Sequence, residues 1–331
     1  MKAFVAVLAL LASVLADEML HAKWSSYKAT HGKRYDARSE AARLEAFTNN
    51  LRLIEEHNAR YARGEVTYAL GLNELSDLSY DEVRATKFGA VISDEARARL
   101  NAIDHVMMPA TGYVDWRDKA VSSVKNQGSC GSCYAFSAAG AVESALMRKN
   151  SGDDDVDLSE QELVDCTYEK LEYNFNMGCN GGDPAMTIEH GLAKNLSREN
   201  DYPYKSGDSG SYQKCKPTKS KVNLQNLKMH KVKYDDEDAL ANALAKSPVA
   251  VTLNAESSDF FSYKKGIYNN TSCSTKPNHA VMLVGYDAKN GQEYWIIKNS
   301  WGSSWGEDGY MKLAKGYNRC GIVAKDSYYV D

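Results

Sequence analysis

QGSCGSCYAF, residues 127–136, is the stretch on which the interpretation of the whole chain depends. It holds two cysteines, Cys130 and Cys133, directly before an alanine-rich segment that favours helix. Ser132 is the kind of residue that begins helices as an N-cap, so Cys133 is predicted to lie in the first helical turn. Free backbone N–H groups and the positive end of the helix dipole favour a thiolate there. The stretch therefore predicts a nucleophilic cysteine at the start of a core helix.

The same pair of cysteines is open to two other interpretations. A CxxC spacing also occurs in redox-active dithiols and in one half of a zinc site. The motif alone does not decide between these alternatives and nucleophilic catalysis, so the rest of the chain has to decide.

The composition is that of a globular protein. The chain has 331 residues, 43% hydrophobic and 25% charged, enough for two packed lobes. Its formal net charge of -4 at pH 7 gives no reason to expect nucleic acid or an anionic membrane as a partner. Residues 1–16 combine a positive start, an apolar run and a small-residue cleavage site, which predicts a secretory signal peptide. No later stretch has membrane-spanning length, so a soluble mature protein is expected.

The cysteines divide the chain. All seven lie at or after Cys130, so the first third of the chain contains no cysteine and is predicted to be a separate region. Export through an oxidising pathway favours disulfides, and an odd count leaves one thiol over.

Residues 17–109 are predicted to form a separate helical segment. One helical stripe recurs at spacings of three and four and consists of Leu44, Phe47, Leu51, Ile54, Asn58 and Tyr61. Asn58 interrupts this stripe and is expected to hydrogen-bond within the fold. Trp24 and Tyr27 indicate a shorter helix before it, residues 71–77 a turn-rich element, and residues 90–109 an exposed linker. A helical domain with an independent function is the alternative.

The rest of the chain divides into two regions with different sequence patterns. Residues 110 to about 225 contain the helix after Cys133 and a second helix at Ser159 to Asp165, begun by a capping box of Ser159 and Glu162. From about residue 226, short apolar runs such as 249–253, 280–284 and 294–297 indicate a β-rich lobe with an antiparallel, barrel-like sheet. Between them, Gly181 and Gly182 either line an extended-peptide site or form a tight turn, and the residues alone favour the turn.

A cysteine nucleophile needs a base, and His279 is the best candidate. It stands at the mouth of an apolar strand, whereas His190 is expected to end a helix and His230 lies among lysines. Asn299 follows the next strand and could orient the imidazole, while Trp301 could shield that bond from water. Taken singly, these residues have ordinary structural alternatives: a core histidine, a turn asparagine and a core tryptophan.

Together these motifs resemble the papain family of cysteine peptidases, in its cathepsin L-like branch and in full precursor form. Residues 127–137, 179–182, 278–280 and 299–302 occur in the family's order. The C-G-[SA]-C-[WY] signature and the low-pKa thiolate of papain are established properties of that family, not results obtained from this chain. Two propeptide patterns also match: Arg43, Phe47, Asn50, Ile54 and Asn58, then Gly71, Asn73, Leu75 and Asp77.

The resemblance implies an α+β, papain-like fold with a helical left lobe and an antiparallel β-barrel-like right lobe. It implies a signal peptide at residues 1–16, a helical inhibitory propeptide of the I29 type at 17–109 and a mature peptidase at 110–331. The expected activity is that of a cysteine endopeptidase acting through an acyl-enzyme, activated at acidic pH by cleavage near residues 105–112. Expected partners are protein and peptide substrates, its own propeptide and cystatin-like inhibitors.

The resemblance further implies a monomer without cofactor or metal, in the lysosome, a digestive vacuole or outside the cell. Two rivals from other classes are a catalytically silent relative kept for binding and a thiol–disulfide oxidoreductase that pairs Cys130 with Cys133.

The resemblance also assigns roles. Cys133 would be the nucleophile, His279 the general acid/base and Asn299 its orienter, and Gln127 would form the oxyanion hole with the backbone N–H of Cys133. Substrate contacts would come from Gly181, Gly182, Asp183, Pro184, Thr252, Pro277, Asn278, Trp301 and Lys325. The implied disulfides are Cys130–Cys179, Cys166–Cys215 and Cys273–Cys320, which leave Cys133 free. Sequons predict glycosylation at Asn195 and at Asn269 or Asn270.

The chain departs from the family at a few places. Tyr134 replaces the commoner tryptophan, and Ser39 stands where the propeptide pattern has glutamate, with Glu40 adjacent. Asn299 lies further along the chain than usual, which predicts a longer hairpin turn at residues 287–292. The segment between Cys166 and Cys179 also looks longer than usual.

Lys325 stands where the family has the bottom of its second specificity pocket. Relatives often carry an apolar or acidic residue there. The hypothesis is that a lysine favours acidic or polar side chains at P2, because a buried cation needs a partner. The alternative is that Lys325 pairs with Asp183 or points to solvent, which would leave the P2 preference apolar.

Overall fold

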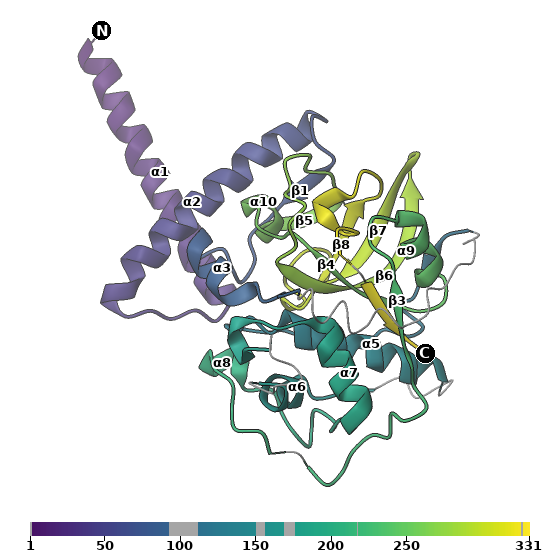
Figure 1. The fold of residues 1–331 in the computed structure, drawn as a ribbon. Helices are drawn as coiled ribbons and strands as arrows, with labels where there is room; N and C mark the ends of the chain where they lie inside the picture. Colours follow the sequence, from purple (N-terminus) through teal and green to yellow (C-terminus); the bar gives the residue numbers. More distant parts are fainter. Residues whose placement is uncertain (1, 93–111, 150–155, 169–175, 217, 326) are drawn as a thin grey trace.

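The computed structural model describes residues 2–92, 112–149, 156–168, 176–216, 218–325 and 327–331. Figure 1 shows three groups of elements: N-terminal helices that cross at the left, a large sheet at the right, and a group of helices below the sheet. The predicted division into a helical part and a β-rich part is confirmed. The longer segment after Cys166, at 169–175, and most of the predicted cleavage region lie outside the described residues.

The N-terminal region contains α1 (Lys2–Thr30) and α2 (Ala37–Ala62). The helix that holds Trp24 and Tyr27 was predicted to be shorter than α2, and this prediction was wrong. The residues of the expected signal peptide also favour helix and extend α1. Among the described residues, no helix is both long and apolar enough to cross a membrane.

The predicted stripe of α2 is confirmed. Phe47 is fully buried and packs on Trp24, with ring centroids 5.1 Å apart. The Asn58 side chain exchanges two hydrogen bonds of 2.9 Å with the backbone of Leu70, which ties α2 to β1 (Tyr68–Leu70). Glu40, the residue beside Ser39, accepts from Trp24 Nε1 at 2.7 Å, so a carboxylate does join α1 to α2.

The helical lobe is built on α5 (Cys133–Lys149), which is buried from Cys133 to Met147. Ser132 directly precedes α5, as predicted, but its hydroxyl lies 2.7 Å from the Tyr204 hydroxyl rather than capping the helix. Around α5 lie α6 (Glu160–Cys166), η3 (Gly178–Asn180), α7 (Pro184–Lys194) and α8 (Ser206–Ser209).

Two local predictions in this lobe were wrong in part. Ser159 accepts from the Glu162 N–H at 3.0 Å, but the Glu162 carboxylate accepts from the Ser197 N–H at 2.7 Å, so only half of the capping box forms. His190 does not end its helix. α7 continues through Gly191 to Lys194, and Asn195, with φ 59°, ends it.

The sheet follows the order β1-β5-β8-β7-β6-β4-β9-β3, with β2 (Val114–Asp115) paired to β6. Its strands are β3 (Met229–Val232), β4 (Val249–Leu253), β5 (Tyr263–Tyr268), β6 (His279–Lys289), β7 (Gln292–Lys298), β8 (Tyr310–Ala314) and β9 (Ser327–Val330). All pairs are antiparallel except β5 with β8. Shorter elements are α3 (Tyr80–Lys87), α9 (Glu237–Leu244), α10 (Ser258–Phe261) and η4 (Arg319–Gly321).

The predicted longer turn at residues 287–292 was wrong. β6 and β7 stay paired to Lys289 and Gln292, and only Asn290 and Gly291 turn, with φ 53° and 80°. Positive φ at both turn residues matches the twist of the flanking strands, so the extra residues lengthen the hairpin instead of its loop.

A buried charge cluster joins the helical lobe to the sheet. Lys125 Nζ lies 2.8 Å from Glu143, 2.6 Å from Asp157 and 2.6 Å from Glu160. Ser122 bonds to both Glu143 and Lys298, at 2.6 Å and 2.9 Å, and so connects the cluster to β7.

Glu160 gives this cluster a predicted pH dependence. Burial raises the pKa of Glu160 from 4.5 to about 8, although Lys125 acts in the opposite direction. Between pH 4.5 and pH 8 the folded chain keeps a proton on Glu160 that the unfolded chain releases. The stability that this proton gives to the folded chain is therefore complete below pH 4.5 and is lost as the pH rises towards 8. In thermal unfolding of the full chain, the Tm of Glu160→Gln minus the Tm of the wild type should increase as the pH rises from 5 to 8. The expected increase is about 2–4 °C for each kcal/mol of unfolding free energy that the wild type loses over this range. Glu293→Gln, at an exposed carboxylate, is the control, and an unchanged difference at Glu160 would contradict the assignment.

Candidate active site

Cys133 begins α5 and is fully buried. The structure contains the disulfides Cys130–Cys179, Cys166–Cys215 and Cys273–Cys320, which are the pairings that the resemblance implied. Every cysteine lies within the described residues, and among them Cys133 alone is free. Because the sulfur of Cys130 is already bonded, the structure does not support either a CxxC redox pair or half of a zinc site.

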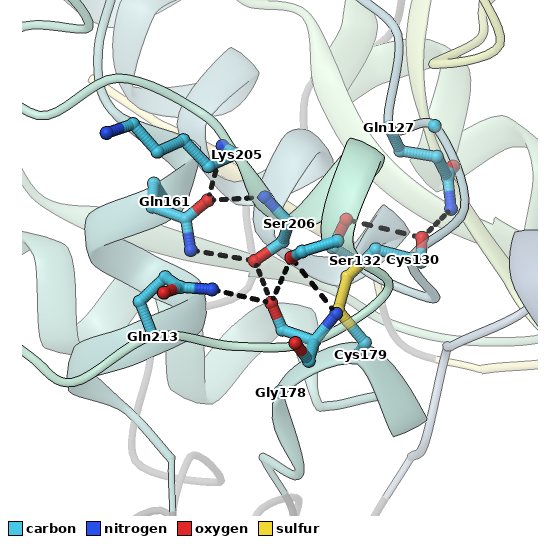
Figure 2. Close-up of a disulfide and its surroundings, with 12 residues drawn as sticks. Gln127, Cys130, Ser132, Gln161, Gly178, Cys179, Lys205, Ser206 and Gln213 are labelled. Carbon is cyan, nitrogen blue, oxygen red and sulfur yellow. Dashed lines mark hydrogen bonds between the residues drawn. A yellow bond between two sulfur atoms is a disulfide. The ribbon is translucent and has the colours of Figure 1, made fainter.

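The Cys130–Cys179 bridge fixes the loops on both sides of the thiol. Figure 2 shows it joining the loop before α5 to η3, with the side chain of Gln127 beside Cys130. Gln127 Nε2 donates to the Cys130 carbonyl at 2.8 Å, and Gln127 Oε1 accepts from the Ser300 hydroxyl at 2.8 Å. This amide is therefore held between the loop that carries the thiol and the loop that follows β7.

His279 and Asn299 come from neighbouring antiparallel strands, β6 and β7. His279 is the first residue of β6 and Asn299 directly follows the last residue of β7. Because the two strands are antiparallel, both residues lie at the same end of this strand pair. His279 Nε2 lies 2.8 Å from Asn299 Oδ1, and an amide oxygen accepts only, so Nε2 carries the proton. The Trp301 ring covers the pair, with its centroid 4.9 Å from that of the imidazole.

The bond to Asn299 leaves the second imidazole nitrogen of His279 unengaged. Nδ1 of His279 is buried and has no hydrogen-bond partner among the described residues. The backbone N–H of Ala280, the next residue along β6, faces the Cys133 sulfur. The start of β6 and the start of α5 therefore meet at the sulfur.

The environment keeps both groups neutral in this structure. Burial raises the pKa of the Cys133 thiol to about 11, against the opposing effect of backbone N–H groups that include those of Ala280 and Gly89. Burial also lowers the pKa of His279 to about 4, while the bond to Asn299 acts in the opposite direction. The side chains that exclude water come in part from the N-terminal region, because the Phe88 ring lies 6.3 Å from the imidazole.

After α3 ends at Lys87, residues 88–91 cross the site as an extended chain. The N–H groups of Gly89 and Ala90 donate to the Asn278 carbonyl at 3.2 and 3.1 Å, and Gly182 N–H donates to Gly89 at 2.8 Å. Val91 N–H returns a bond of 2.9 Å to Gly182, so Ala90 and Gly182 form a parallel bridge. The preference for a turn at Gly181 and Gly182 was thus incomplete: Gly181 turns, with φ 115°, and Gly182 pairs with an extended peptide.

The segment that precedes Gly89 also reaches the Gln127 amide. Gln127 Nε2 donates a second bond, of 3.2 Å, to the Lys87 carbonyl. A Cβ on Gly89 would lie 1.8 Å from the Gly131 carbonyl oxygen, so only glycine fits where the chain passes the thiol loop. Residues 87–89 precede the range that the sequence assigned to a linker, and their role was missed because nothing local in Lys87-Phe88-Gly89 marks it.

The other residues predicted to contact substrate lie in different local environments. Asp183 caps α7 by accepting from the Ala185 N–H at 2.8 Å, and Pro184 is the first residue of that helix. Thr252 is buried on β4 opposite Ala280. Pro277 and Lys325 are half-buried, and no ion pair to Lys325 is found within the described ranges.

Two residues that hold the site were not predicted. The Ser300 hydroxyl orients Gln127, as described above, and the Tyr204 hydroxyl donates to the Gln127 carbonyl at 2.8 Å. Ser300 could have been found from its place in the sequence Asn299-Ser300-Trp301, whereas nothing near Tyr204 in the sequence distinguishes it.

The sequons differ in their surroundings. Asn195 ends α7 and accepts from the Leu224 N–H at 2.9 Å, whereas the Asn270 amide donates to Asp259 at 3.0 Å. Glycosylation at these positions stays a prediction.

Comparison with known proteins agrees with this geometry. Residues 110–330 match the family described as "Papain family cysteine protease", and residues 24–83 match the "Cathepsin propeptide inhibitor domain (I29)". Digestive cysteine proteinase 1 of Homarus americanus is 37% identical over 97% of this chain and 98% of its own length. Pro-cathepsin H of Medicago truncatula is 39% identical over 97% of this chain and 89% of its own.

Solved structures of similar fold also include precursor forms. Digestive procathepsin L 3 from the larval midgut of Tenebrio molitor superimposes with a TM-score of 0.81 at 35% identity, over 94% of this chain and 98% of that chain. The recombinant stem bromelain precursor gives a TM-score of 0.75 at 31% identity, over 94% and 98% of the two chains.

Proposed function

The chain belongs to the papain family of cysteine proteases and carries that family's I29 inhibitor domain, and from this premise we propose that it is an endopeptidase in which Cys133 is the nucleophile. One observation carries the proposal: a single free thiol begins a buried helix that packs on β6, and the first residue of β6 is a histidine whose Nε2 is held by Asn299 and whose Nδ1 has no hydrogen-bond partner among the described residues. A silent relative kept for binding would not need this arrangement.

The proposed reaction follows from the atoms in the site. His279 Nδ1 takes the proton of the Cys133 thiol, and the thiolate attacks the scissile carbonyl carbon. Gln127 Nε2 and the Cys133 backbone N–H donate to the oxyanion. His279 then gives its proton to the leaving amine, which leaves an acyl-enzyme. A water that His279 deprotonates then attacks the acyl carbon, the bond to the Cys133 sulfur breaks as the acid leaves, and His279 returns the proton to the sulfur. Asn299 keeps the ring in one orientation throughout.

The N-terminal region is proposed to block this reaction until it is removed. The Lys87 carbonyl occupies the donor that an oxyanion would need, and residues 89–91 occupy the backbone groups of Gly182 and Asn278. We assign residues 17–109 to the propeptide, 110–331 to the mature enzyme and 1–16 to a signal peptide. Disulfides and a signal peptide support entry into the secretory pathway, with the lysosome, a digestive vacuole or the exterior as destination.

Substrate contacts are assigned to the same cleft. We propose that Gly182 and Asn278 bind substrate backbone and that Gly181, Asp183, Pro184, Thr252, Pro277, Trp301 and Lys325 form its walls. Cystatin-like inhibitors and a monomeric state remain part of the proposal.

Acidification should promote activation. Burial lowers the pKa of His279 from its ordinary value of 6.5 to about 4 in the covered site. We propose that removal of the propeptide returns this pKa towards 6.5. Between these values protonation favours the open form, and the stability of the closed form falls as pH drops.

We therefore predict that conversion of the purified precursor accelerates as pH falls from 6.5 to 4. Gel analysis of conversion at fixed times over this range would check it, with salt held constant because exposed ion pairs are screened by salt. A conversion rate independent of pH would contradict the linkage.

Lys325 is predicted to tune the choice of the P2 residue. We propose that its ammonium faces the second specificity pocket and favours glutamate or aspartate there. In a P2-diversified fluorogenic library, Lys325→Leu should lower kcat/KM for acidic P2 residues by about two- to fivefold, because a partly exposed ion pair contributes less than about 1 kcal/mol. Lys289→Leu, at an exposed lysine of the β6–β7 hairpin, is the matched control. No preference for Asp or Glu at P2 in the wild type would refute the idea.

A direct test of the whole proposal is labelling of the acid-treated chain with an epoxide thiol inhibitor. One equivalent should be incorporated at Cys133 with parallel loss of peptidase activity. Absence of labelling would support a silent relative.

A further inference from the structure

Strand β1 of the N-terminal region completes the sheet at one edge. It pairs antiparallel with β5, with Tyr68 opposite Gly266, Ala69 opposite Lys265 and Leu70 opposite Tyr263. Two backbone bonds extend the contact: Ile267 N–H donates to Thr67 at 3.1 Å, and Gly71 N–H donates to Ser262 at 2.8 Å. On its other side, β5 pairs with β8 only through Ile267 and Tyr268. Removal of the propeptide therefore exposes most of β5 as an unpaired strand edge.

A side-chain pocket accompanies this edge. The Tyr68 side chain is buried, its hydroxyl donates to the Asp259 carboxylate, and its ring lies 4.7 Å from the ring of Tyr268. Tyr268 and Asn270 also donate to Asp259, at 2.7 Å and 3.0 Å. Apart from Tyr68, these groups lie in the part that matches the protease family, so the pocket remains after the propeptide leaves.

The edge is shaped for a strand. Gly266 has φ +92°, and a Cβ there would lie 2.4 Å from the Thr67 carbonyl oxygen, so the glycine permits close approach of a paired backbone. Lys264 and Lys265 are exposed on the same strand. Lysines on an edge strand oppose indiscriminate self-pairing and attract acidic side chains.

We propose that the β5 edge and the Asp259 pocket become an exosite of the processed enzyme for an extended segment of its protein substrates. The segment carries a tyrosine at the position of Tyr68 and an acidic residue at the position of Ala69, opposite Lys265. Main-chain bonds to β5 supply affinity, and the pocket supplies selectivity. The inference rests on the proposed function only in requiring that the propeptide be removed.

The first experiment measures binding to the processed enzyme after its thiol is blocked with the epoxide inhibitor. The probe is a fluorescent peptide with the sequence of residues 65–73, EVTYALGLN. Tyr68→Phe in the peptide should weaken binding about 10- to 100-fold, as expected for loss of a hydrogen bond to a charged group. Ala69→Glu should strengthen it about two- to fivefold, and Lys265→Glu in the enzyme should reverse that order.

The second experiment measures turnover. A fluorogenic substrate joined to the same peptide by a flexible linker should have a KM at least tenfold lower than the free substrate, with kcat unchanged, because tethering raises the effective concentration. Asp259→Asn should abolish this advantage without changing kinetics on the free substrate, and Asp238→Asn, at an exposed carboxylate on α9, should leave both unchanged. Lys265→Glu tests the same surface at an exposed side chain if Asp259→Asn does not fold.

The outcomes separate cleanly. Equal KM for tethered and free substrates, or displacement of the peptide by a short cleft-directed inhibitor before blocking, would overturn the exosite. Binding of the whole detached propeptide but not of the nine-residue strand would overturn its use by substrates. Absence of turnover of the free substrate would instead refute the proposed function, whereas peptide binding to the blocked enzyme would still report on the edge.

Discussion

Cys133→Ala is expected to abolish both peptidase activity and self-processing of the precursor. Loss of a catalytic nucleophile typically lowers kcat by about 10⁶-fold, because no other group in the site forms the covalent intermediate. Incubated at acidic pH, this variant should stay uncut on a gel while the wild-type precursor converts. The change removes one buried sulfur and adds no polar group, so the fold should be retained.

A trace of active wild-type enzyme is the control for that experiment. Added to the Cys133→Ala precursor, it should cleave the chain at the same place, which shows that the variant is folded and its cleavage segment accessible. Prompt conversion of the purified variant without added enzyme would disprove processing through Cys133.

Gln127→Ala should lower kcat by about 100- to 1,000-fold with little change in KM. The Gln127 amide is held at both of its polar atoms: the nitrogen donates to the Cys130 carbonyl and the oxygen accepts from the Ser300 hydroxyl, so the amide is positioned before substrate arrives. Its bond to a substrate oxygen gains strength as negative charge develops, which is why its loss affects the transition state more than binding. Steady-state kinetics of the processed enzyme would separate the two constants.

Two controls sharpen this measurement. Gln225→Ala removes an exposed glutamine amide away from the site and should change neither constant. Gln127→Glu keeps an acceptor for Ser300 but removes the donor, so it should be as slow as the alanine variant. A loss confined to KM would show that Gln127 binds substrate without stabilising the oxyanion.

Much of the fold could be predicted from local patterns. The stripe of α2, the strand β4 with bounds Val249–Leu253 and the start of α5 at Cys133 all follow from residues close in sequence. Backbone propensity and the periods of helices and strands are local properties, which is why a short window suffices. Cys133, His279 and Asn299 were predicted in the same way, because each stands at the end of a recognisable helix or strand, whereas Gln127 was assigned only through the family resemblance.

Other features depend on residues far apart in the chain. Glu162 bonds to Ser197 instead of closing its own capping box, and Gly182 pairs with a segment that precedes it by about ninety residues. The Asp259 pocket for Tyr68 is of the same kind.

Local patterns were enough to predict most helices and strands and the side chains suited to thiol catalysis. Tertiary structure decided which partner each polar group takes and which chain covers the cleft. The physical reason is competition: once burial removes water, a backbone N–H or carboxylate bonds to whichever group the fold brings nearest, and that choice is not recorded in the neighbouring residues.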